Sequence, residues 1–175
     1  SLIGTVCGWL YFVSEHASEA LAHAIGERPV VKAMLAGLAL AICGTVLPYT
    51  MFAGETQADV LMETYLTIPA GVLIATGLVK AMLTPALINM GWRGGHFFPV
   101  IFSGVSLGYG LAILTGADPV FCVAVCTAST MGAVMRQPVM VVGLLLMCFP
   151  LKGIVCMIIA AVIAAGIPLP KSLRK

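Results

Sequence analysis

The sequence predicts an all-α integral membrane fold, and three observations lead to that prediction. Of the 175 residues, 61% are hydrophobic and only 9% are charged, whereas soluble domains carry roughly 25% charged residues. The few charges separate uncharged stretches that can be compared with the ~20 apolar residues that a membrane-spanning helix needs. Nineteen glycines and ten prolines interrupt these stretches, and both residue types are common in membrane helices. We therefore expect a lipid bilayer around the chain.

The same composition argues against other classes of function. Nine Lys and Arg nearly balance seven Asp and Glu and form no basic stripe, so no nucleic-acid partner is expected. The six cysteines lie in apolar surroundings and are interpreted as small hydrophobic residues. Cys122 and Cys126 share a helix face, but the other ligands of a metal site are missing, so we expect no metal and no cofactor. No nucleophile is paired with a base, so the chain is not expected to be an enzyme.

The first elements are predicted from the apolar stretches and their breaks. Residues 1–29 should form one long helix that leaves the membrane, because the apolar residues 2–13 run into a helix-favouring stretch. Pro29 should end it, since proline disfavours helical geometry in the residue before it. The next helix is expected from about Val30 to Pro48 or Met51. A short solvated helix should follow around the acidic residues Glu55, Asp59 and Glu63.

The later elements are predicted to be broken and tilted helices. Residues 30–92 should form the helices before the motif described below. The last apolar stretch of this part covers residues 69–92, and Lys80 and Pro85 are expected to interrupt it. Residues 93–170 hold apolar segments that break at residues 116–119, 136–138 and 150–152. The last two segments are too short to cross a bilayer, and short membrane helices are tolerated only where they line a cavity or are buried in protein. This pattern favours a transport pathway over a simple anchor.

The basic tail predicts the orientation of the chain. Residues 171–175 hold three of the nine basic residues. Basic residues gather on the cytoplasmic side of membrane proteins. The C-terminus is therefore expected in the cytoplasm, with the protein in the inner (plasma) membrane of the cell.

The most informative motif is GGHFFP at residues 94–99. Two glycines let the chain turn tightly before an apolar helix, and Pro99 fits a first helical turn, where no amide donor is needed. The free N–H groups of that turn, at the positive end of the helix dipole, can bind an anion without a full positive charge. Such a site can also release a halide. The alternative is a glycine hinge with a packing face at Gly104 and Gly108.

Several motifs resemble those of the CLC family of chloride channels and proton/chloride antiporters. Residues 95–99, GHFFP, resemble the family's G-x-F-x-P motif, with KAMLT (80–84) and NMG (89–91) before it and FSG (102–104) after it. MGAVMRQP at residues 131–138 is similar to the later M-G-A…R-A-P element. GIPL at residues 166–169 resembles the G-x-P-L that ends the last membrane helix. The motifs keep the family's order across most of the chain.

The resemblance implies an architecture and a function. CLC subunits contain two inverted halves, and anion sites form where helix ends of both halves meet, which is a general design of transporters. Residues 1–175 resemble the second, C-terminal half, in which residues 93–170 would form the anion-site part. The G-S-G-I-P and G-[K/R]-E-G-P motifs of the first half do not occur in these residues. The implied partners are the first half, a second copy in a homodimer, and chloride or a related small anion.

The resemblance also assigns site residues. The anion-binding residues would be Gly95, His96, Phe97, Phe98 and Pro99, with the backbone N–H groups of His96 and Phe97 as donors. The family's anion-contacting tyrosine follows G-x-P-L, where this chain has Pro170. Met147 replaces a family glutamate, so the sequence supports no prediction of proton coupling and leaves channel and antiporter open.

Three charged or titratable residues have two interpretations each. Lys80 either raises the local anion concentration through its field or extends to the membrane interface along its aliphatic stem. Arg136 either offsets the negative end of a helix dipole or contacts the anion. His96 either makes transport depend on pH or is a packed neutral residue.

Two alternative functions remain. The chain could be a structural or degenerate half-module without its own pathway, or a secondary transporter that uses broken helices for another solute.

Overall fold

The computed structural model describes residues 1–51, 54–149 and 153–168, and these residues contain helices and connecting segments but no strand. The predicted all-α membrane fold is confirmed. In the described part of the chain, α2, α4 and α5 are long and apolar enough to cross a membrane. The helices are α1 (Leu2–Ile25), α2 (Pro29–Val46), α3 (Glu55–Thr64), α4 (Ala70–Asn89), α5 (Phe97–Thr115), α6 (Pro119–Met135), α7 (Pro138–Cys148) and α8 (Ile154–Gly166), with 3-10 turns η1 (Pro48–Thr50) and η2 (Tyr65–Thr67).

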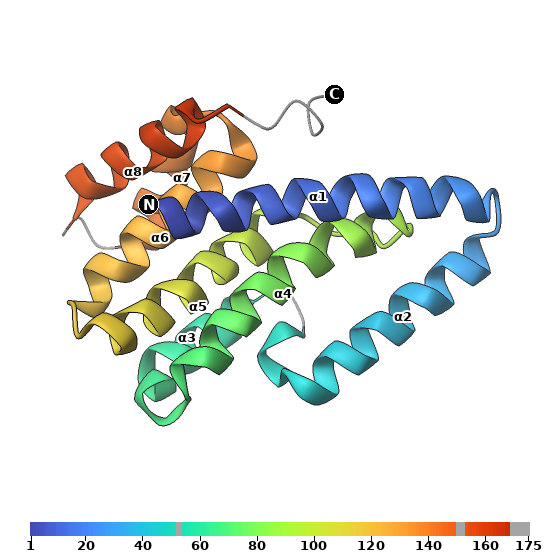
Figure 1. Ribbon diagram of the computed structural model, residues 1–175, viewed down its shortest axis with the longest axis horizontal. Helices are drawn as coiled ribbons and strands as arrows, with labels where there is room; N and C mark the ends of the chain where they lie inside the picture. Colours follow the sequence, from blue (N-terminus) through green and yellow to red (C-terminus); the bar gives the residue numbers. More distant parts are fainter. Residues whose placement is uncertain (52–53, 150–152, 169–175) are drawn as a thin grey trace.

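Helix α5 is central to the packed body of the molecule. It contacts α4 and α6 most extensively, α1 lies across α4 and α6, and α8 covers α6 (Figure 1). The predicted packing face of α5 is confirmed. A Cβ atom at Gly104 would lie 2.4 Å from the Cα of Thr127, and one at Gly108 would lie 2.4 Å from the Cα of Val123. The two glycines therefore let the α5 and α6 backbones approach closely, as small residues do in membrane proteins.

Prolines begin three helices, as the local chemistry predicts. Pro29, Pro119 and Pro138 occupy the first helical position, where no amide hydrogen is needed. Asp118 completes the start of α6 because its carboxylate accepts a hydrogen bond from the N–H of Phe121 at 2.9 Å. The predicted breaks of the chain at these three positions are therefore confirmed.

One predicted break is wrong. Lys80 and Pro85 do not interrupt the apolar stretch, because α4 continues through both residues to Asn89. Membrane helices tolerate an internal proline where neighbouring groups and side chains compensate for the lost hydrogen bond. The Thr84 hydroxyl donates to the carbonyl of Lys80 at 2.8 Å, one residue before Ala81, whose carbonyl lacks the helical donor that proline cannot supply.

The remaining predicted helices are found, and one of them, α2, has few contacts with the rest of the molecule. The long first helix is confirmed as α1, and α3 is the short helix with Asp59 and Glu63 exposed. Helix α2 lies at the edge of the molecule (Figure 1). All of its residues are described, and among them only Ala36 is buried. The basic tail, residues 171–175, and Pro170 lie outside the described residues.

Candidate anion site

The first turn of α5 leaves its amide groups unpaired. His96 is the N-cap, with φ −92° and ψ −12°, and the first hydrogen bond runs from the N–H of Val100 to the carbonyl of His96 at 3.2 Å. Among the described residues, none accepts a hydrogen bond from the N–H groups of His96, Phe97 or Phe98. Pro99 has no N–H. The positive end of the α5 dipole is thus open for an acceptor, as at any uncapped helix start.

The tight turn expected at Gly94 and Gly95 is wrong. The positive φ in this loop belongs to Gly91, at 94°, and residues 92–95 run on without regular structure. Gly94 and Gly95 are exposed, and a Cβ atom at either position would meet no atom within 4 Å. Their contribution is the missing side chain, which leaves the backbone before α5 uncovered.

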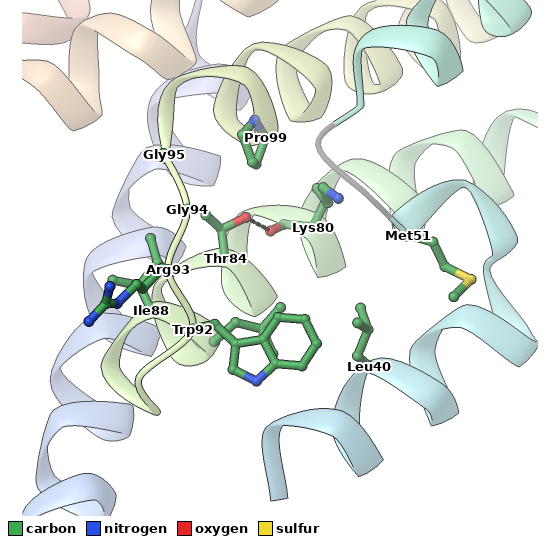
Figure 2. Close-up of a pocket in the computed structure, with 11 residues that line it drawn as sticks. Leu40, Met51, Lys80, Thr84, Ile88, Trp92, Arg93, Gly94, Gly95 and Pro99 are labelled. Atoms are coloured by element: carbon green, nitrogen blue, oxygen red, sulfur yellow. Dashed lines mark hydrogen bonds between the residues drawn. The ribbon is translucent and has the colours of Figure 1, made fainter. Parts of the chain in front are cut away.

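A cavity of about 450 Å³ adjoins this uncovered backbone. Figure 2 shows α2 and Met51 on one side of it and the end of α4 with the loop 92–95 on the other. Its lining is mostly apolar, with two cations, and consists of Leu40, Met51, Lys80, Thr84, Leu87, Ile88, Trp92, Arg93, Gly94, Gly95 and Pro99. The fold therefore brings three residues of the predicted motif, Gly94, Gly95 and Pro99, together with Lys80, which is distant in sequence.

The other predicted site residues lie nearby but outside this cavity. The His96 and Phe97 rings stack on each other, with centroids 4.6 Å apart and planes 21° apart, and neither residue lines the cavity. Phe98 lines a second cavity of about 370 Å³ together with Ile101 and Phe102. The first turn of α5 thus borders both cavities, with Pro99 at the first and Phe98 at the second.

Lys80 is buried inside the molecule. Its side chain is 4% exposed, and its ammonium donates to the carbonyl oxygen of Thr50 at 2.7 Å. The nitrogen also lies 6.0 Å from the centre of the Phe102 ring, at the outer limit of a cation–π contact. The interpretation that Lys80 extends to an interface is therefore wrong, and the positive charge is placed beside the cavity.

Arg136 joins two helix ends instead of facing the motif. It follows α6 in the left-handed conformation, with φ 54°, and its Nη2 donates to the carbonyl of Ile167, at the end of α8, at 2.8 Å. A cation at two helix C-termini is favourable because both dipoles end there with negative charge. Arg136 lines neither of the two cavities beside the motif, so the structural interpretation is favoured.

Some residues of the site were not found by sequence reasoning. Arg93 and Trp92, directly before the motif, line the cavity. The positive charge of Arg93 next to the motif is the sequence feature that could have indicated this. Met51 and Leu40 reach the cavity from α2 and its corner, and no local sequence feature marks them.

A family model described as voltage gated chloride channel matches residues 1–168. No curated protein and no solved structure matches the chain.

Proposed function

This chain belongs to the voltage gated chloride channel family, and on that premise we propose that it is the second, C-terminal half of a membrane domain that conducts or exchanges chloride or a related small anion. The family consists of channels and transporters in lipid bilayers and not of enzymes. Residues 1–175 would then supply one side of the pathway. The anion site would comprise the backbone around Gly95, His96, Phe97, Phe98 and Pro99.

The cavity beside α5 is the observation that carries this proposal. It combines the uncovered backbone at Gly95 with the buried charge of Lys80. Amide donors bind an anion without the strength of a full charge, so the anion can leave again, as conduction requires. The Lys80 ammonium, held in a medium of low dielectric, would raise the local anion concentration through its field.

The proposed partners are a first half of the membrane domain, lipid and a second copy of the chain. A first half with its own helix ends would face the open side of the cavity and complete the coordination of the anion. The exposed apolar residues of α7 and α8, among them Val139, Met147 and Val155, provide a surface that lipid or a second copy in a homodimer would cover. The C-terminus would lie in the cytoplasm and the protein in the inner (plasma) membrane.

Chloride flux from liposomes tests the proposal. The protein, expressed together with a first half that carries the G-S-G-I-P and G-[K/R]-E-G-P motifs, should release chloride faster than protein-free vesicles. Flux of chloride without protons would indicate a channel, and coupled proton movement an antiporter. Efflux equal to that of empty vesicles would support the structural half-module, and flux of a different solute alone would support the other transporter class.

His96→Ala is expected to leave the pH dependence of chloride flux unchanged between about pH 5 and pH 7, the range over which a histidine commonly changes charge. The reason is geometric: the imidazole stacks on Phe97 and does not line the cavity. Efflux rates of the two proteins across this range provide the measurement. A flattened profile in the variant would show instead that His96 controls the rate through its charge.

A further inference from the structure

We propose that Lys80 is also a positioning residue, whose ammonium holds the corner between α2 and η1 in place as one wall of the cavity beside α5. The inference rests on the proposed function in one respect, because it takes this cavity to be the one that faces the anion. In this second role the lysine acts on the position of the cavity wall and not directly on the anion.

The acceptor of the lysine is a rigid part of the chain. Thr50 is fully buried at 0% exposure, and its N–H and its hydroxyl both donate to the carbonyl of Leu47, at 2.9 and 2.7 Å. The carbonyl of Thr50 is therefore held at one position when it accepts from Lys80 at 2.7 Å. Hydrogen bonds from a charged donor are about twice as strong as neutral ones. This bond joins two elements that are 30 residues apart in sequence.

Helix α2 has few other contacts that could fix its position. Only 6% of this span is buried, although all 18 of its residues are described. A helix that packs on a protein normally buries an apolar stripe along its length. Without such a stripe, the position of α2 depends on its two ends, which are the connection to α1 and the corner at η1.

The corner determines the shape of the cavity. Met51 follows Thr50 and lines the cavity. Its side chain packs against α2 at Gly44, where an added Cβ atom would lie 2.8 Å from the Met51 sulfur. Figure 2 shows Leu40 and Met51 opposite Ile88 and Arg93, with Lys80 near Met51. A displacement of Thr50 would therefore move Met51 and the α2 wall away from α4, and the cavity would widen.

Positioning and field effects respond differently to substitution. The field of Lys80 depends only on its charge, whereas its hold on Thr50 needs a donor to the carbonyl oxygen. Lys80→Arg keeps both the charge and a donor to the carbonyl, whereas Lys80→Met removes both and keeps an unbranched side chain of similar length.

Pulsed electron paramagnetic resonance between labels on α2 and α4 tests the positioning role. Labels on noncanonical residues at the exposed positions Leu38 and Met82 leave the native cysteines intact. We expect one narrow distance distribution for the protein with Lys80 and for Lys80→Arg, and a broad, longer one for Lys80→Met. Lys32→Met is the matched control, because it removes the same charge from α2 at a residue that does not line this cavity, and it should keep the narrow distribution.

Chloride flux in the same variants provides the second readout. Lys80→Met should lose at least about fivefold in rate, and Lys80→Gln, which keeps a neutral donor to the Thr50 carbonyl, should lose less, whereas a field effect alone would give these two neutral variants the same rate. Lys80→Arg, which keeps a charged donor to the Thr50 carbonyl, should recover the rate to within about twofold of the parent protein. If Lys80→Met does not fold, Lys80→Gln, which keeps a neutral donor, should give an intermediate width and rate.

Two results would overturn the inference. One is an unchanged distance distribution in Lys80→Met, or in Lys80→Gln where that variant replaces it. The other is an equal loss of flux in Lys80→Met and Lys80→Gln, which would show that only the charge of Lys80 matters. Neither would affect the proposed function, which fails separately if the parent protein transports no chloride.

Discussion

Gly95→Asp is expected to lower chloride flux by at least about tenfold while the protein folds and inserts normally. The added side chain fits because a Cβ atom at Gly95 meets no atom within 4 Å. The carboxylate would stand in the cavity beside the first turn of α5, where it repels the anion that the amides attract. Two like charges 4 Å apart repel by about 1 kcal/mol in water and about 4 kcal/mol at a dielectric constant of 20, and about 1.4 kcal/mol changes an equilibrium tenfold.

Gly95→Ala is the matched control for this prediction. It adds the same Cβ atom without the charge. Because that atom meets no neighbour within 4 Å, the flux of this variant should stay within about twofold of the parent protein. Efflux from liposomes at equal protein content measures both variants, and elution as a single peak in detergent shows that they fold. Equal rates for Gly95→Asp and Gly95→Ala would show that the backbone before α5 does not face the anion.

Gly104→Val is expected to abolish or severely reduce the yield of folded protein. A Cβ atom at Gly104 would lie 2.4 Å from the Cα and 3.0 Å from the N of Thr127, and this backbone belongs to α6 in the packed body. Because backbone atoms cannot move aside as a flexible side chain can, the two helices would have to separate. Overpacking in cores costs about 1–3 kcal/mol and sometimes more, and native proteins have only about 5–15 kcal/mol of stability.

Gly37→Val provides the control for the packing prediction. Gly37 also lies in the middle of an apolar helix, α2, but a Cβ atom there meets no atom within 4 Å. Both substitutions place the same β-branched residue in a helix, so their intrinsic helix propensities change equally. Thermal unfolding in detergent should show a normal midpoint for Gly37→Val and a lowered midpoint or no folded protein for Gly104→Val. Similar midpoints for the two variants would contradict the close contact between α5 and α6.

Local chemistry explains why most helix boundaries could be predicted from the sequence. Pro29, Pro119 and Pro138 each begin a helix because proline lacks an amide hydrogen and restricts the residue before it. Such effects act over one or two residues and need no tertiary contacts. Pro85 is the instructive failure, because the same residue within α4 does not end the helix. Whether a proline ends a helix or is tolerated within it depends on the surrounding helices, which the local sequence does not specify.

The candidate site was predictable only in part. The sequence by itself determined the membrane class, the order of the helices and the start of α5 at residues 94–99, because composition and nearby prolines and glycines act locally. Only the tertiary structure decided that Lys80 lies buried against Thr50, that Arg136 binds the end of α8, and that α2 forms one wall of the cavity. These contacts join residues about thirty or more positions apart. They arise from the packing of whole helices, which no single stretch of sequence encodes.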